Sequence, residues 1–183
     1  AIVREQKIVT RPDRAASIRL ASPAENAQSP APHMDPPRLI GNTGEYGEFV
    51  LTTGMSPDAT GKALAFDDFS HPAVTWTLTA HEARPGHELQ FARMIEAGVS
   101  IARAVFAFNS VNVEGWGLYS ERLADEMGIY SSELDRFGIA SFDAWRAGRL
   151  VVDTGMHALG WTRDRAIAFM TEHSALGENN IAN

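Results

Sequence analysis

The pattern of apolar and polar positions divides the chain into an irregular first part and a helical second part. From Pro72 onward, stretches of helical character alternate with residues that begin or end helices. Pro72 suits the first turn of a helix, Ser132 with Asp135 resembles a capping box, and Gly128 and Gly160 suit helix C-termini. We therefore expect helices over residues 72–82, 87–98, 101 to about 109, 113–127, 132–159 and 162–173.

The first part lacks this pattern. Residues 1–45 are rich in Pro, Ala, Ser and Arg, and five prolines within 15 residues of SPAENAQSPAPHMDPPR block any continuous helix. We expect irregular, extended chain, either a free linker or a meandering segment tied to a larger body. The stretch GEYGEFVLTTG predicts a short strand around Phe49, at a sheet edge and ending at Gly54, or a hairpin. The last residues, GENNIAN, carry no pattern, and we expect them to fray.

Composition fits one globular domain, mainly α, with a helical core over residues 46–183. The chain has 183 residues, 44% of them hydrophobic, which suffices for a core. A net charge of −7 and scattered arginines argue against a nucleic-acid partner, and no apolar run approaches the roughly 20 residues of a membrane-spanning helix. Cysteine is absent, which excludes disulfides and thiolate metal ligands. The chain starts at Ala1 without Met or a signal-peptide pattern, so we expect a section of a longer protein.

Candidate chemistry begins in TAHEARPGHELQ, residues 79–90, which gathers two histidines and two glutamates. In the zinc motif H-E-x-x-H the histidines lie one helical turn apart, and the glutamate serves as general base. His87 follows His81 by six residues, about 600° on a helix, so an unbroken helix would leave the rings roughly 120° apart. Pro85 and Gly86 break or widen the helix, and a π-type turn is one way to bring the rings together. The alternative is a pair of capping or surface histidines.

A third metal ligand is available in FNSVNVEGWGLYSERL. Glu114 and Glu121 are seven positions apart, so they lie on nearly the same face of a helix. Two carboxylates on an otherwise apolar and aromatic stripe are costly to bury unpaired, and a bound cation offsets that cost. Gly115 and Gly117 indicate the close approach of another backbone or a ligand. The alternative is that the glutamates face solvent or pair with arginines such as Arg122.

The stretch WRAGRLVVDTGMHALGW places Arg149, Asp153 and His157 on one face of a helix, four positions apart. In a functional arrangement, His157 would donate a hydrogen bond to a developing oxyanion and Asp153 would fix the tautomer of His157. Arg149 would anchor a substrate carboxylate or Asp153. In a structural arrangement, the same residues form an ion-pair ladder on the helix surface. Arg146 is the weaker candidate in this stretch.

The three stretches HEARPGHELQ, VEGWGLYSERL and WRAGRLVVDTGMHALGW, in this order, resemble the domain of unknown function 885 family of bacterial proteins. The hallmark of that family is similar to HExxPGHxLQ followed by EGWxLYxE and RLxxDTGxH, and the resemblance covers about residues 35–175. It implies a zinc metallopeptidase with a mainly helical, gluzincin-like fold, metal ligands His81 and His87, and Glu82 as general base. Family members are much longer, and many carry a second histidine where this chain has Glu88.

The same resemblance implies Glu114 as the third ligand of Zn²⁺, with Glu121 supporting a ligand or taking the third position itself. We expect a peptide substrate whose oxyanion is steadied by His157 and Tyr119. The rival interpretation is a non-catalytic helical module that associates with a missing part of a full-length protein or with a second copy. Hydrolysis of a non-peptide amide or ester would use the same residues.

Overall fold

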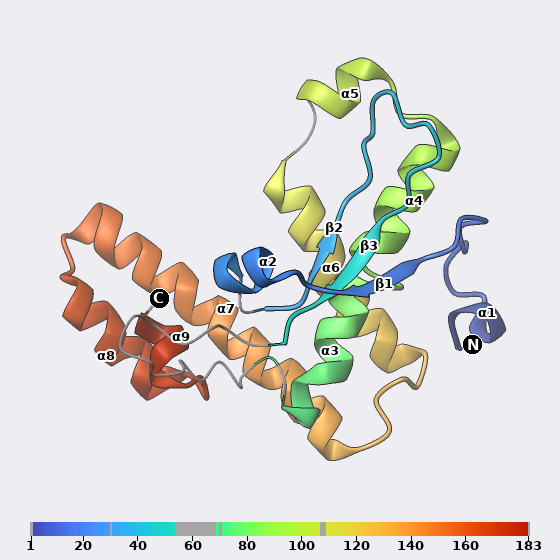
Figure 1. The fold of residues 1–183 in the computed structure, drawn as a ribbon. Helices are drawn as coiled ribbons and strands as arrows, with labels where there is room; N and C mark the ends of the chain where they lie inside the picture. The colour runs from blue at the N-terminus through green and yellow to red at the C-terminus, as the bar shows by residue number, and fades with distance from the viewer. Residues whose placement is uncertain (1, 30, 54–68, 70, 107–108, 183) are drawn as a thin grey trace.

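The computed structural model describes residues 2–29, 31–53, 69, 71–106 and 109–182. Within them the chain is mainly helical with one small sheet, as predicted (Figure 1). The helices are α1 (Ile2–Gln6), α2 (Pro23–Gln28), α3 (Pro72–Glu82), α4 (His87–Ala97), α5 (Ile101–Phe106), α6 (Ser110–Glu126), α7 (Glu133–Leu159), α8 (Arg163–His173) and α9 (Glu178–Ala182). The strands are β1 (Ser17–Leu20), β2 (His33–Asp35) and β3 (Glu48–Leu51). None of the helices in these ranges has both the length and the apolar character needed to cross a membrane.

Helix α3 is central because it packs against both α6 and α7 (Figure 1). Val74 and Leu78 of α3 form a buried cluster with Phe142 of α7. Ala80, farther along α3, belongs to a second cluster with Ala124 of α6. Burial of these apolar side chains drives the three helices together. The C-terminal end of α3, where the HE pair lies, is therefore fixed by two neighbouring helices.

Most helices begin and end at the capping residues that we predicted. Ser132 caps α7 by accepting a hydrogen bond from the backbone N–H of Asp135, whose carboxylate accepts one from the backbone N–H of Ser132. Gly160 ends α7 in the left-handed conformation, with a φ of 69°. Thr162 caps α8. The break predicted over residues 109–112 is shorter than expected, because Asn109 is the N-cap of α6 and residues 110–112 already lie in its first turn.

The sheet differs from the single edge strand that we predicted. Strand β3 lies between β1, which is parallel to it, and β2, which is antiparallel. It is therefore the central strand, and its Phe49 and Val50 are buried. Strands of three or four residues are too short to show alternation, so their pairing was not visible in the sequence. Strand β3 ends at Leu51, and the predicted end at Gly54 lies outside the described residues.

Two segments that we predicted to be irregular contain short helices. Helix α2 forms between two prolines because Pro23 occupies its first turn, where no backbone donor is lost, and Ser22 with Glu25 makes a capping box. The prediction that the C-terminal tail frays is also wrong, since α9 forms there and contacts α8. The Arg163 guanidinium donates a hydrogen bond to the Ala182 carbonyl, which holds α9 in place.

Hydrogen bonds tie the N-terminal residues to the helices that carry the HE pair. The backbone N–H of Arg14 donates to Glu96 of α4 at 2.9 Å, and its carbonyl accepts from Arg84 at 2.7 Å. The N–H of Met34 in β2 donates to the Glu82 carboxylate at 2.9 Å. The segment thus meanders against the larger body instead of forming a free linker.

The close packing of α3 on α7 predicts that Gly138→Ala destabilises the fold. A methyl group on Gly138 would lie 1.9 Å from the carbonyl oxygen of Ala73, so the two helices would have to separate. We expect a loss of about 1–3 kcal/mol in the free energy of unfolding, measured by urea denaturation. An unchanged unfolding midpoint would show that α3 and α7 are not held this closely.

Candidate metal centre

His81 and His87 come together at the turn between α3 and α4. Helix α3 ends at Glu82 and α4 begins at His87, and the two imidazole ring centroids are 4.7 Å apart. A Cβ on Gly86 would lie 1.8 Å from the His81 carbonyl oxygen, so only glycine allows this turn. The prediction that the Pro-Gly pair lets the two rings converge is confirmed. The predicted break is present, since α3 and α4 are separate helices, and across the turn the Glu88 N–H donates to the Ala83 carbonyl five residues earlier, the spacing of a π-type hydrogen bond.

Helix α6 holds this turn from the other side. The indole N–H of Trp116 donates to the carbonyl oxygens of Pro85 and Gly86, at 3.0 and 3.1 Å. A methyl group on Gly117 would lie 2.5 Å from His81 Nε2, whereas one on Gly115 would meet no atom within 4 Å. The predicted close approach is therefore confirmed at Gly117 and wrong at Gly115.

Glu114 of α6 completes a three-residue group. Its Oε2 atom lies 3.3 Å from His81 Nε2 and 3.8 Å from His87 Nε2. One ligand atom from each residue lies within 4.8 Å of the others, a spacing that could hold a metal ion. Two imidazole nitrogens and one carboxylate oxygen are a donor set that zinc accepts. Both histidines are 5% exposed and the Glu114 side chain is 65% exposed, so solvent reaches the group from the Glu114 side.

The other nitrogen of each histidine ring faces an oxygen acceptor. Nδ1 of His81 lies 2.7 Å from Oε1 of Glu121, and Nδ1 of His87 lies 3.4 Å from the amide oxygen of Gln90. If each Nδ1–H donates to its acceptor, each Nε2 presents a lone pair toward Glu114. Lone pairs from two rings and a carboxylate repel one another unless a proton or a cation lies between them. The arrangement thus favours a cation at the point where the three residues meet.

Glu121 supports His81 and is itself neutralised by Arg146 of α7. Glu121 is completely buried and accepts two hydrogen bonds from the Arg146 guanidinium, at 2.6 and 3.1 Å. Of the two glutamates seven positions apart, Glu114 faces Nε2 of His81 and Glu121 faces Nδ1. Arg122, which we considered as a partner of these glutamates, pairs with Asp143 instead. A carboxylate on Nδ1 fixes the ring and makes Nε2 a stronger ligand.

The charges around the histidines shift the pKa values of the group. Although burial acts to lower the pKa of His81, hydrogen bonds with Glu114 and Glu121 raise it to about 9. Hydrogen bonds with His81 and His87 lower the pKa of Glu114 well below its ordinary range. Burial raises the pKa of Glu82, whose carboxylate accepts the Met34 hydrogen bond. Without a metal ion His81 therefore holds a proton at neutral pH and pairs as an imidazolium with the Glu114 carboxylate, and a metal ion at this point would take the place of that proton.

The residues predicted on α7 are divided between the site and the surface. Arg146, which we ranked below Arg149, reaches the site through Glu121. Arg149 stacks on Trp145 at 4.8 Å and lines a cavity beside the histidines. Asp153 and His157 are 76% and 77% exposed and lie 3.7 Å apart, as in the ion-pair ladder. We ranked Arg146 too low because its partner, Glu121, lies 25 residues away on another helix.

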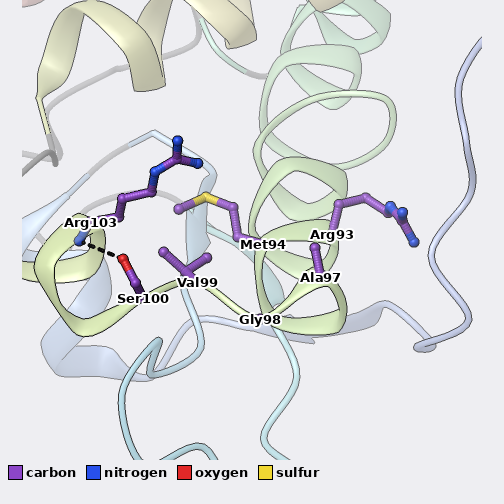
Figure 2. Close-up of a pocket in the computed structure, with 7 residues that line it drawn as sticks. All are labelled: Arg93, Met94, Ala97, Gly98, Val99, Ser100 and Arg103. Carbon is purple, nitrogen blue, oxygen red and sulfur yellow. Dashed lines mark hydrogen bonds between the residues drawn. The ribbon is translucent and has the colours of Figure 1, made fainter.

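A second hollow lies between α4 and α5, away from the histidines (Figure 2). Its volume is about 460 Å³, and it offers two arginines, Arg93 and Arg103. Figure 2 shows their side chains directed to different sides, and Arg93 is paired with Glu96 at 2.8 Å. The two guanidinium groups do not converge on a common point, so this hollow lacks the chemistry of the histidine site.

Comparisons with known proteins agree with the sequence resemblance. A family model described as "Bacterial protein of unknown function (DUF885)" matches residues 1–183. The chain is also similar to a crystal structure described as that of the "putative lipoprotein from Colwellia psychrerythraea", with a TM-score of 0.78 and 28% sequence identity. The similarity covers 99% of this chain and 29% of that chain, so the chain spans less than a third of that protein. No curated protein matches the chain.

The approach of α6 to His81 predicts different effects for two neighbouring glycines. Gly117→Ala should displace the His81 ring and lower the affinity for Zn²⁺ about tenfold or more, measured by competition with a chromogenic chelator. Gly115→Ala is the matched control on the same helix, and it should leave the affinity unchanged. Equal affinities for both variants would contradict the observed packing of Gly117 on the ring.

The buried carboxylate behind His81 yields a second prediction. Glu121→Gln keeps the shape of the side chain but removes the charge that orients and polarises the ring, so Zn²⁺ affinity should fall about 10–100-fold. Glu126→Gln changes an exposed glutamate of the same helix and should have no effect. Affinities that agree within about twofold across the three proteins would rule out a supporting role for Glu121.

Proposed function

The chain belongs to the DUF885 family of bacterial proteins, described as being of unknown function, and we propose a function from its site: zinc-dependent hydrolysis of peptide bonds. One observation carries the proposal. His81 and His87 direct Nε2 toward the Glu114 carboxylate, while their Nδ1 atoms face Glu121 and Gln90. This arrangement supports the proposal because a metal centre requires oriented ligands and a side open to solvent.

His81, His87 and Glu114 would hold the ion, and their nitrogen and oxygen donors suit zinc. When bound, zinc would supply the Lewis acidity that activates water and polarises a carbonyl group. Glu121 and Arg146 would keep the His81 ring in its orientation, because both lie against it from the buried side. A fixed ligand orientation is what a catalytic centre requires.

Glu82 is the residue that we assign as the general base. It follows His81 at the end of α3 and lines the same cavity as His81 and Glu114. Burial raises its pKa, which brings the carboxylate closer to the pKa that suits proton transfer near neutral pH. The Met34 N–H holds Oε2 of Glu82, so Oε1 is the oxygen that would take a proton from the attacking water. The same proton would then pass to the leaving amine.

The roles of His157 and Tyr119 in stabilising the oxyanion stay predictions. His157 is exposed on α7 beside Asp153, and Tyr119 is exposed on α6, with its ring 5.9 Å from that of Trp116. The choice of a peptide as substrate rests on the family resemblance in the three motifs. A non-peptide amide or ester would be cleaved by the same residues.

A non-catalytic module is the second candidate, and exposed apolar side chains favour it. Phe106 and Val111 are each 85% exposed at the junction of α5 and α6, and Leu150 is 75% exposed on α7. Apolar surface of this kind is typical of a region that associates with another protein surface. In this alternative the chain binds metal without hydrolysing peptides, and Glu82 has no catalytic role.

Substitution of Glu82 separates the two candidates. In the hydrolase, Glu82→Gln should retain about one zinc ion per chain but lose about 10²–10⁴-fold in the rate of peptide cleavage, because amide oxygen is a poor base. His81→Ala should lose the ion itself, and Glu172→Gln, which changes an exposed glutamate of α8, should behave as the unaltered protein.

Metal content is measured by mass spectrometry on protein purified without added zinc. Zinc that is absent from the unaltered protein would reject the metal centre, and cleavage that is insensitive to Glu82→Gln would favour the module.

A further inference from the structure

A small cavity extends from the metal-ligand group toward α7. Its volume is about 150 Å³. Its lining includes His81, Glu82 and Glu114 of the metal-ligand group and Trp145 and Arg149 of α7. Binding sites for drug-sized ligands are usually about 300–1,000 Å³, so this cavity has room for one residue of a substrate and not for a longer peptide.

The wall of the cavity is aromatic. Ring centroids of Phe69, Phe142 and Trp145 lie 5.8–6.4 Å from one another, and Leu78 of α3 adds an aliphatic side chain. Phe69, Leu78 and Phe142 are buried members of the same core cluster, so the wall is rigid. The half-buried Trp145 ring is the accessible part of this wall, and an apolar side chain that covers it removes apolar surface of both groups from water.

Two arginines lie on this wall, and they differ in what they contact. Arg146 is engaged by Glu121, so its charge is already neutralised. Arg149 stacks its guanidinium on Trp145 at 4.8 Å and is exposed to solvent. Within the described part of the chain Arg149 forms no ion pair, and Asp153, one helical turn away, lies beside His157 instead. Stacking on an indole leaves the edge of a guanidinium free to donate two hydrogen bonds to a carboxylate.

On the basis of the proposed function, we propose that this cavity binds the C-terminal residue of the substrate. The apolar side chain of that residue packs on the aromatic wall, and its free carboxylate pairs with Arg149. Since the cavity has the volume of about one residue and is lined by both the candidate metal ligands and Arg149, the bond at the metal ligands would be the last peptide bond of the chain. Water adds across this C–N bond, the new carboxyl group stays on the shortened peptide, and the proton taken by Glu82 goes to the amine of the released amino acid.

The site therefore prefers peptides with a free C-terminal carboxylate. The first test compares N-acetyl-Ala-Phe with its C-terminal amide as substrates of the zinc-loaded protein. We expect the acid to be cleaved with a kcat/KM about 10–100-fold higher, as a charge-assisted pair contributes this much. Arg149→Gln should remove the preference by raising KM for the acid alone. Arg165→Gln is the matched control, because Arg165 stacks on Trp161 at 4.0 Å outside the cavity, and it should keep the preference.

The second test measures binding without catalysis. Calorimetry of the metal-free protein should show 3-phenylpropionate binding at least about tenfold more tightly than 3-phenylpropanamide, and only Arg149→Gln should abolish the difference. If the acid binds selectively but no peptide is cleaved, the proposed hydrolase is wrong and the carboxylate subsite stands. If peptides are cleaved with no preference for the acid, the hydrolase stands and the subsite is wrong. A binding preference that persists in Arg149→Gln also overturns the subsite.

Discussion

The fold and the site depend on one buried contact, in which the His81 ring lies between two carboxylates of α6. Glu121 faces Nδ1 from the protein interior and Glu114 faces Nε2 from the solvent side. A buried glutamate without a partner would cost several kcal/mol, and Arg146 of α7 removes that cost. The contact joins α3, α6 and α7, the same helices that form the core, so packing and ligand geometry cannot be changed independently.

Two glycines, which lack a side chain, are as important as the charged residues in bringing these helices together. Gly86 allows the α3–α4 turn to fold back on the His81 carbonyl, and Gly117 allows α6 to reach the imidazole ring. Trp116 then closes the turn through hydrogen bonds to two backbone carbonyls. The ligands are carried by helices whose relative positions are fixed at backbone distance, which is the rigidity that a metal centre needs. The sheet contributes through Met34, which holds the Glu82 carboxylate.

Local signals in the sequence predicted the helices between Pro72 and His173, and the motifs gave the three residues of the candidate ligand group. Pro72, Gly98 and the Ser132–Asp135 capping box each determine a helix end within a few residues of themselves. Their effect can therefore be predicted from the sequence without knowledge of the fold. The seven-residue spacing of Glu114 and Glu121 is likewise a property of one helix. The sheet and the importance of Arg146 were not predictable, because each depends on partners that are distant in the sequence, 13 or more residues for the strand pairs and 25 for Arg146 with Glu121.

The candidate metal-ligand group and the proposed substrate site differ in how much of each this chain contains. The three candidate ligands and the side chains that support them all fall within residues 81–146, so the chain contains the whole candidate group. The chain spans less than a third of the Colwellia protein, and a substrate cleft can include surfaces beyond that share. Arg149 matters in this respect because it supplies a positive charge beside Glu82 and Glu114 from within the chain. Under the proposed function, a carboxylate held at Arg149 would be oriented by the same helix, α7, that fixes His81 through Arg146.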